Sequence, residues 1–252
     1  MENIFSRNEL IWGKKAQDTL KEKHIAVFGL GGVGGYALES LARSGIGYFT
    51  IVDFDKVSVT NINRQIIALH STVGENKAKL FKERLLDINP DVKINVIENF
   101  YNTRLNDLIF AEKVDFVVDA IDTMRSKIEL LTYCKKNDIP VVTSMGAGNR
   151  LDPTMLCLTD ISKIENKKDV FVKNILYQLA QNGIESGITA VVSREKPHVA
   201  EKIMNTEKIQ TPDGEYFEFN KISPGSTPFV PAVAGYYMAF FVLKSLLNIQ
   251  GK

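Results

Sequence analysis

The stretch His24-Ile25-Ala26-Val27-Phe28-Gly29-Leu30-Gly31-Gly32-Val33-Gly34 decides the fold of this chain. Its first five residues form a short apolar run, which suits a strand buried on both faces of a parallel sheet. The glycines follow the pattern G-x-G-x-x-G, which permits a tight turn and a close approach of backbone N–H groups to a bound phosphate. The stretch therefore predicts a strand, a phosphate-binding turn at Gly29, Gly31, Gly32 and Gly34, and the start of a helix.

A helix and a second strand are expected directly after the glycine turn. Residues 36, 38, 41 and 42 supply the apolar positions of the helix, and Gly45 is placed to end it in a left-handed conformation. The second strand, Phe49-Thr50-Ile51-Val52, is followed by Asp53, nineteen residues beyond Gly34. A strand, a glycine turn, a helix and a second strand that ends in an acid form the Rossmann layout. The sequence therefore predicts a nucleotide site at this turn.

The alternation of helices and strands continues as far as residue 150. A helix expected over 71–89 is stopped by Pro90, because proline cannot continue a helix. Such alternation is typical of an α/β fold with a mostly parallel sheet and helices on both faces. We expect further strands over 93–97, 116–119, 140–144 and 155–159, and further helices over 105–110, 125–137 and 169–182.

The composition fits a folded domain and argues against several other classes of protein. The chain has 252 residues, of which 44% are hydrophobic, and its net charge of +1 gives no strong attraction to DNA or to a membrane surface. Its two cysteines, Cys134 and Cys157, form no C-x-x-C pair, which favours a reducing compartment and no structural zinc site. Residues 1–7 lack an apolar signal core, so we expect a cytoplasmic protein. The uncharged segment 229–243 suits a packed helix, so stable membrane insertion is not expected.

Charged side chains follow the predicted strands where a triphosphate would need them. Arg64 and Lys77 come after the second strand and could reach back over the crevice, and Asp122 follows the strand over 116–119. Asp122 could hold Mg²⁺ against phosphate oxygens, and the two cations could stabilise charge at the α-phosphorus. A dinucleotide leaves its pyrophosphate mainly to backbone groups and needs fewer cations. The set therefore favours ATP-dependent adenylation of a carboxylate over hydride transfer with NAD.

Each of these polar residues also has a purely structural explanation. Asp122 could cap the helix that follows it, and Asn61 could close a turn. Arg64 could pair with Asp55. Taken jointly, the spacing of the residues favours the nucleotide site.

Six short motifs resemble the adenylating enzymes related to ubiquitin activators, a family that includes the bacterial activators of sulfur-carrier proteins. The resemblance covers about the first 150 residues and is highly specific as a series of motifs. The motifs are Gly29 to Gly34, Asp53-x-Asp55-x-Val57, Asn61-x-x-Arg64-Gln65, Val73-Gly74-x-x-Lys77, Ile88-Asn89-Pro90 and Asp119-Ala120-Ile121-Asp122.

The resemblance implies roles for the residues of the site. The aspartate matching Asp53 binds the ribose of ATP, and the one matching Asp122 binds Mg²⁺. An arginine near the N-terminus, here Arg7, reaches the ATP of the other subunit, so a homodimer would be required for activity. ATP and Mg²⁺ are the expected cofactors, and the presence of a monovalent cation (Na⁺ or K⁺) is left open. The candidate catalytic residues are Arg7, Arg64, Lys77 and Asp122, and the candidate nucleotide-binding residues are Gly29, Gly31, Gly32, Gly34, Asp53, Asp55, Asn61, Arg64 and Lys77.

Three motifs in the rest of the chain resemble the branch of this family that dehydrates threonylcarbamoyladenosine in tRNA. They are Met145 to Thr154, Val192 to Pro197 and Pro224 to Pro231. On this resemblance we expect one adenylating domain over 1–252, with a nucleotide-binding half, 1–150, and a second α/β half for substrate and dimer contacts, 151–252. The implied reaction transfers AMP to the threonyl carboxylate, and an atom of the neighbouring carbamoyl group then closes a ring. This intramolecular attack needs no enzyme nucleophile, which fits two cysteines that we expect to be core residues.

Contact with tRNA must rest on a local patch of positive charge. Residues 161–210 hold eight Lys and Arg against six acids, and the helix over 169–182 is poorer in Arg than relatives tend to be. A solvated helix face is therefore as good an explanation of these charges as phosphate contact. The candidate contacts are Lys168, Lys173, Arg194 and Lys196.

Three other functions stay open at this point. A sulfur-carrier activator would adenylate a terminal Gly-Gly carboxylate with the same first half, although such enzymes usually carry two C-x-x-C pairs. A redox protein would use the glycine turn for NAD. A non-catalytic scaffold would act beside a cysteine desulfurase and its sulfur acceptor.

Overall fold

The structure, a computed structural model, describes residues 3–165, 169–198, 201, 204–210, 216–222 and 224–249. Eight α-helices and nine strands are found in this part of the chain. The helices are α1 (Ser6–Trp12), α2 (Lys14–Lys21), α3 (Gly34–Arg43), α4 (Lys77–Ile88), α5 (Asn106–Ile109), α6 (Met124–Lys136), α7 (Val170–Gln181) and α8 (Phe229–Leu246). The strands are β1 (His24–Phe28), β2 (Tyr48–Val52), β3 (Lys93–Ile97), β4 (Phe116–Asp119), β5 (Val141–Ser144), β6 (Leu156–Asp160), β7 (Thr189–Ser193), β8 (Met204–Gln210) and β9 (Tyr216–Ile222).

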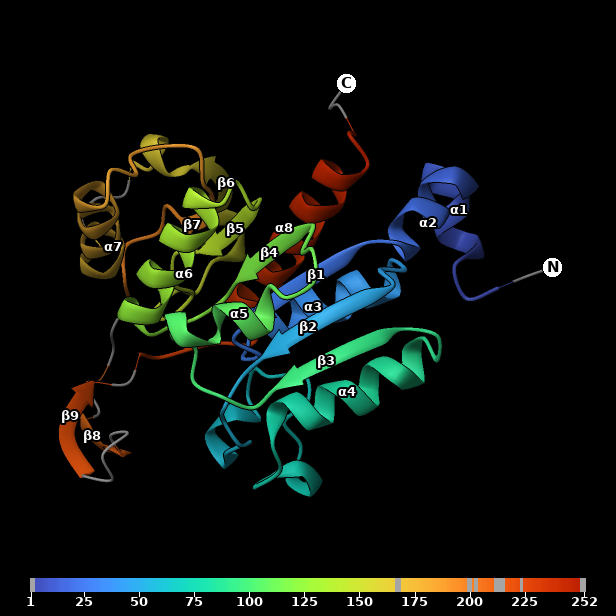
Figure 1. Cartoon of the computed structure of the whole chain (residues 1–252). Coiled ribbons are helices and arrows are strands. Elements are labelled where there is room, and N and C mark those ends of the chain that lie inside the picture. Colours follow the sequence, from blue (N-terminus) through green and yellow to red (C-terminus); the bar gives the residue numbers. More distant parts are fainter. Residues whose placement is uncertain are drawn as a thin grey trace.

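Seven strands form one sheet in the order β3-β2-β1-β4-β5-β7-β6, and β8 pairs with β9 in a separate hairpin (Figure 1). All neighbours in the large sheet are parallel except β6, which runs antiparallel to β7. The order turns back after β3, so that β4 lies beside β1. In such a sheet the loops after these two strands diverge and leave a crevice at their carboxyl ends. The predicted α/β fold is confirmed.

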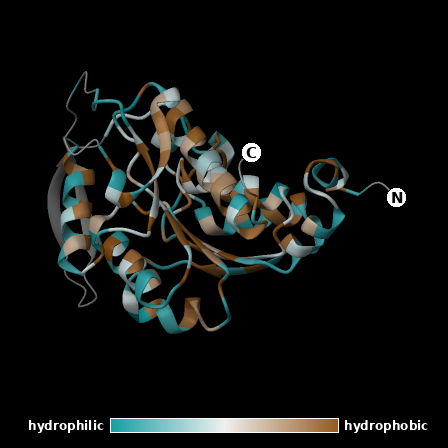
Figure 2. Cartoon of the chain, turned by 90° about the horizontal axis from the view of Figure 1, so that it is seen from above, coloured by the Kyte–Doolittle hydropathy of each residue, from teal (hydrophilic) through white to brown (hydrophobic). Residues whose placement is uncertain are grey.

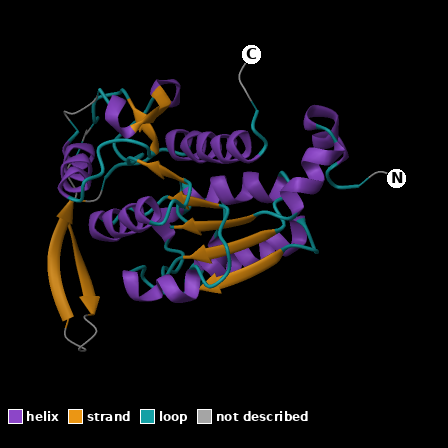
Figure 3. Ribbon diagram, turned by 45° about the horizontal axis from the view of Figure 1, so that its top comes forward, coloured by secondary structure: helices purple, strands orange, loops and turns teal. Residues whose placement is uncertain are grey.

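Helices cover both faces of the central strands, and alternate residues of each strand face opposite layers. In β1, Ile25 and Val27 pack in one core cluster with residues of α3, α4 and α8. Ala26 and Phe28 belong to the other cluster, with residues of α6 and α7. Figure 3 shows the strands between the helices, and in Figure 2 the central strands are mostly brown. The apolar run in β1 is thus explained by two covered faces.

One predicted helix begins later than the sequence suggested. We expected a helix over 71–89, but α4 begins at Lys77. The difference has a local cause: Gly74 has a φ of +93°, which is left-handed, and the side chain of Asn76 accepts a hydrogen bond from the Lys79 N–H at 3.1 Å. Asn76 is therefore the helix cap. This late start places Lys77 in the first turn, beside the end of β2.

Helix α8 packs against α3 around Gly235 and also contacts β5, β6 and β7. By length and composition alone it could cross a membrane, with a mean hydropathy of 1.5. A Cβ atom at Gly235 would lie only 2.4 Å from the backbone oxygen of Val33, so the two helices meet backbone to backbone. Val230, Met238 and Val242 are buried in the core cluster of that face. These contacts are those of a core helix.

Candidate functional site

A cleft of about 290 Å³ lies at the carboxyl ends of β1, β2 and β4. Small-molecule sites commonly enclose about 300 Å³ or more, so this is the size of site that a nucleotide needs. The cleft brings together most of the residues predicted from the sequence. These are Gly29, Gly31, Gly32, Asp53, Asp55, Asn61, Arg64, Lys77 and Asp122.

The glycine turn packs closely against the loop that follows β4. Gly29 has a φ of +80°, and a Cβ atom there would lie 2.7 Å from the backbone oxygen of Ala120. Gly34 does not line the cleft; its hypothetical Cβ would lie 1.8 Å from the Gly29 oxygen. Gly34 therefore allows the tight shape of the turn but does not line the cleft, whereas Gly31 and Gly32 do.

Asp53 fixes the conformation of this turn. One of its carboxylate oxygens accepts a hydrogen bond from the Leu30 N–H at 2.6 Å, and the other accepts one from the Asp55 N–H at 2.8 Å. Its side chain is buried, and this burial raises the pKa of Asp53, opposed by the charge of Lys77. The carboxylate joins the ends of β1 and β2, and Asp53 lines the cleft.

Two cations stand at the polar end of the cleft. Lys77 Nζ lies 2.8 Å from Asp55 Oδ2, and its side chain is 5% exposed. Arg64 donates from Nη1 to the Thr60 oxygen at 2.8 Å and to Asn63 Oδ1 at 2.9 Å. The alternative in which Arg64 pairs with Asp55 is therefore wrong, because Lys77 takes that partner. Burial lowers the pKa of Arg64, and the charge of Asp122 opposes this shift.

Asp122 and Asn61 complete the predicted polar set. The Asp122 side chain is exposed, and the contact shown for it in the described residues is with the Thr123 hydroxyl at 3.5 Å. Thr123 is the N-cap residue of α6, so the alternative in which Asp122 caps this helix is wrong. Asn61 Oδ1 accepts a hydrogen bond from the Ser58 N–H at 3.1 Å, which confirms that Asn61 closes a turn. It also lines the cleft, so the two roles coexist.

The donor set suits Mg²⁺ held jointly with phosphate. The described residues contain no group of three or more His, Cys, Asp or Glu that could hold a metal by themselves. Mg²⁺ is commonly bound through one or two carboxylates together with substrate phosphates and water. The exposed carboxylate of Asp122 fits that requirement.

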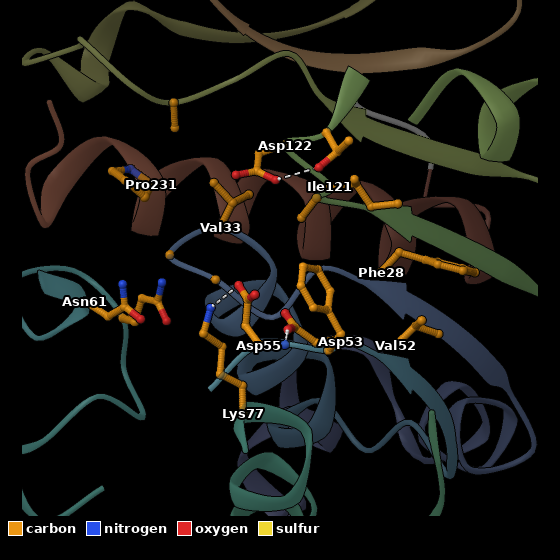
Figure 4. A pocket seen from close by; sticks show the side chains of 18 of the residues that line it. Phe28, Val33, Val52, Asp53, Asp55, Asn61, Lys77, Ile121, Asp122 and Pro231 are labelled. Carbon is orange, nitrogen blue, oxygen red and sulfur yellow. Dashed lines mark hydrogen bonds and ion pairs between the residues drawn. The ribbon is translucent and has the colours of Figure 1, made fainter. Parts of the chain in front are cut away.

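Sequence reasoning missed the apolar end of the cleft and one of its walls. Phe28, Val52 and Ile121 lie at the end away from Asn61 (Figure 4), and such surfaces suit a purine ring. Gln65 lines the cleft with a buried amide oxygen that has no partner among the described residues. Gln65 belongs to the motif Asn61-x-x-Arg64-Gln65, but no sequence signal pointed to a role of its own for this residue.

The missed wall is a segment that we call the strap, residues 224–226. Asn63 donates to the Ser226 oxygen at 2.9 Å. Asn149 exchanges two hydrogen bonds with Gly225, each 2.7 Å long. The strap thereby connects the segment after β2 with the loop after β5, and Pro224 and Ser226 line the cleft. Its Pro-Gly-Ser sequence was a visible turn signal, but its distant partners were not.

The other predicted residues lie away from the cleft. Arg7 is exposed on α1, near the carboxyl end of α3, where Asn8 donates to the Arg43 oxygen at 2.8 Å. Lys173 is exposed on α7 and lines a surface groove with Tyr177, whereas Arg194 lines a different groove. Lys196 is exposed after β7, and Lys168 lies outside the described residues. Cys134 is buried in α6, where burial raises the pKa of its thiol, and Cys157 is in β6.

Known proteins match nearly the whole chain. The model of the ThiF family matches residues 5–252. The tRNA threonylcarbamoyladenosine dehydratase of Bacillus subtilis is 42% identical over 244 residues, covering 97% of this chain and 94% of the relative. A crystal structure of the Escherichia coli enzyme of that name in complex with ATP has a TM-score of 0.81 at 32% sequence identity. The match covers 97% of this chain and 93% of the chain of the E. coli enzyme. The same E. coli enzyme in complex with AMP has a TM-score of 0.83 at 32% identity, with 97% and 94% covered.

Proposed function

Because this chain belongs to the ThiF family, we propose that it is an ATP-dependent enzyme that dehydrates threonylcarbamoyladenosine in tRNA. The observation that carries the proposal is the convergence of Arg64, Lys77 and Asp122 on one cleft with the glycine turn. The likeness to the named dehydratases over more than nine-tenths of both chains supports the choice of substrate.

The cleft supports a definite orientation for ATP. The apolar end suits the adenine ring, Asp53 suits a ribose hydroxyl, and the glycine turn and the start of α3 suit phosphate. Mg²⁺, when bound with the phosphates, would be held by Asp122 and would neutralise part of their charge. Arg64 and Lys77 then provide positive charge beside the phosphate chain.

The chemistry proceeds by activation and ring closure. A carboxylate oxygen of the threonyl group attacks the α-phosphorus, and pyrophosphate leaves. The acyl carbon now bears AMP, a far better leaving group than oxide. An atom of the neighbouring carbamoyl group attacks this carbon, its proton is lost to solvent, and AMP departs with the former carboxylate oxygen. Both reacting groups belong to one nucleoside, so the protein supplies orientation and charge stabilisation and no covalent nucleophile.

The cysteine content is a reason to prefer this reaction over the transfer of AMP to a sulfur-carrier protein. With two cysteines, 23 positions apart, the chain cannot form the two C-x-x-C pairs usual in those activators. The NAD alternative is disfavoured because Lys77, Arg64 and Asp122 exceed what a dinucleotide pyrophosphate requires.

We further propose that the enzyme is a homodimer, that residues 1–252 act as one domain and that it works in the cytoplasm, where ATP and tRNA are found. Arg7 lies outside the cleft of its own subunit, so a role at the phosphates requires a second copy. The exposed apolar residues Leu10 and Ile11 next to it, 78% and 82% exposed, suit such an interface.

The direct test is conversion of a defined substrate. Purified protein is incubated with ATP, Mg²⁺ and tRNA that carries threonylcarbamoyladenosine, and the nucleosides are examined by mass spectrometry. We expect a product lighter by one water, with one pyrophosphate released per nucleoside. Pyrophosphate release that requires a Gly-Gly carrier protein and ignores tRNA would support the sulfur-carrier alternative instead.

A further inference from the structure

A fully buried ionic cluster lies directly behind the loop that carries Asp122. Lys127 Nζ lies 2.6 Å from Asp119 Oδ2, and the hydroxyl of Thr143 donates to the same oxygen at 2.7 Å. The Lys127 ammonium also donates to the Thr143 hydroxyl at 3.1 Å. All three side chains are 0% exposed. None of them lines the cleft.

The cluster joins three elements at one point. Asp119 ends β4 and Thr143 is its register partner in β5, while Lys127 lies in the first turns of α6. The remaining oxygen of Asp119 accepts a hydrogen bond from the Ile121 N–H at 3.1 Å. The carboxylate therefore fixes the backbone one residue before Asp122.

The same loop is held against the glycine turn from its other side. The Ala120 N–H donates to the Phe28 oxygen at 2.9 Å, which extends the pairing of β1 and β4. The close contact between Gly29 and Ala120 leaves no room for a side chain. The loop before Asp122 is thus held from two sides, by Asp119 with its two partners and by the backbone contacts of Ala120 with the glycine turn.

Stability does not account for this arrangement. Burying an ion pair carries a desolvation penalty, and apolar groups of similar volume are often as stabilising or more so. The pair between Lys23 and Asp115, at the opposite end of β4, keeps 27% and 13% of its side chains exposed and so loses less hydration than the fully buried pair. The buried pair lies at the end of the strand where the cleft is.

We propose that Asp119, Lys127 and Thr143 are positioning residues that hold the 120–123 loop so that Asp122 can share Mg²⁺ with ATP. This inference rests on the proposed nucleotide site but not on the identity of the acyl substrate. The residues act through the backbone of the loop and touch neither ATP nor metal. Their loss should therefore weaken the Mg²⁺-dependent part of ATP binding and leave the affinity for tRNA unchanged.

The sharpest variant is Thr143→Val, which removes one hydroxyl at nearly constant shape. We expect the Mg²⁺ concentration that half-saturates ATP binding to rise about tenfold, the usual scale for loss of a partner behind a metal ligand. Calorimetric titration of ATP at several Mg²⁺ concentrations measures this without tRNA or turnover. Thr143→Ser keeps the hydroxyl and should restore the wild-type dependence.

Further variants distinguish a positioning role of the cluster from an effect on folding. Lys127→Met leaves Asp119 buried without a compensating charge and is expected to fold poorly. The double variant Asp119→Asn with Lys127→Met places neither charge in the cluster and should keep a melting temperature near that of the wild type. The double variant should still show the Mg²⁺ defect. Lys23→Met, at the other end of β4, should leave the Mg²⁺ dependence unchanged.

The outcomes are distinct. Wild-type Mg²⁺ dependence in both Thr143→Val and the folded double variant would overturn the positioning role. A chain that binds Mg·ATP with these shifts but never cyclises threonylcarbamoyladenosine would keep the positioning role and refute the proposed substrate.

Discussion

At the scale of single residues, Lys77 in the cleft has one partner within the protein and a second, proposed partner in ATP. Lys77 is paired with Asp55 in the structure, yet both line the space proposed for the phosphates. A buried ammonium is favoured there because its charge is already compensated before ATP binds. Phosphate can then share the cation without any large rearrangement, which is the property expected of a preorganised site.

Replacing Lys77 by Met tests this arrangement. The variant loses a fixed positive charge at the phosphates and leaves Asp55 without its cation, so we expect kcat for tRNA-dependent pyrophosphate release to fall by about 100-fold or more. Lys79→Met is the matched control, since Lys79 is two residues further along the same helix, with its side chain 64% exposed and paired with Glu98 at 3.4 Å. Equal losses in the two variants would contradict a specific role for Lys77.

At the scale of elements, helix α3 is held to α4 by one buried carboxylate. Glu39 is 2.6 Å from Arg84 and 2.7 Å from Arg43, and its own side chain is 7% exposed. Burial alone would raise the pKa of Glu39, but the hydrogen bonds and charges of Arg84 and Arg43 together outweigh it, and the pKa is lowered from 4.5. The glycine turn that lines the cleft leads directly into α3, so this ion pair holds the helix behind the proposed phosphate site.

The lowered pKa of Glu39 predicts a pH-dependent effect of Arg84→Met. A carboxyl group whose pKa is lower in the folded state stabilises the fold at pH values above its unfolded pKa, and this stabilisation is lost as the pH falls through the folded value. We expect Arg84→Met to lower the free energy of unfolding by about 1 kcal/mol near pH 7, a modest figure because Arg84 is 37% exposed, and by less near pH 3. Urea denaturation at both pH values measures the difference.

A control for that effect lies on another helix. Arg125 pairs with Glu129 at 2.9 Å but is 87% exposed, so Arg125→Met should change stability little at either pH. An Arg84→Met effect that stays constant between the two pH values would show that the loss is one of packing rather than of charge.

The sequence predicted most of the elements because their signals are local. The five strands from β1 to β5 were placed within a residue or two, since buried parallel strands are continuous apolar runs. The α4 start was wrong because a left-handed glycine and an asparagine cap outweighed helical periodicity. The crevice at the carboxyl ends of the strands was expected from the Rossmann layout, whereas the order of the seven strands comes from the structure.

The walls of the cleft could not be predicted in the same way. The strap meets Asn63 and Asn149 from positions more than 70 residues away along the chain, and no local pattern records such a contact. Asp119 and Lys127 were visible as charges, but their complete burial depends on β5 and α6 packing together. Tertiary contacts of this kind are set by the whole fold.

At the scale of the whole molecule, Arg7 gives a test of the proposed dimer. Arg7→Ala and Asp122→Ala should each be inactive alone, because each lacks one part of the shared site. Mixed in equal amounts and allowed to exchange subunits, they should recover about one quarter of the wild-type rate, since about half of the dimers are mixed and each of these has one complete site. No recovery, despite mixed dimers shown by mass spectrometry, would mean that Arg7 does not act across the interface.

The proposed contact with tRNA can also be tested at the scale of the whole molecule. Replacing Lys173, Arg194 and Lys196 together by Gln should reduce the slope of log Kd against log salt by about 2, because each phosphate contact contributes about 0.7 to 0.9. Lys82 in α4, Lys93 in the edge strand β3 and Lys113 in the segment before β4 are exposed, and their replacement by Gln is the control. Unchanged slopes in the first variant would remove these residues from the interface.

The position of the strap late in the chain has a consequence for biosynthesis. All seven strands of the large sheet are complete by Ser193, whereas the cleft wall needs residues 224–226 and Pro231. A nascent chain can thus assemble its sheet on the ribosome before it can enclose a nucleotide. Translation must run into the last helix, α8, before the cleft that we propose for ATP is complete.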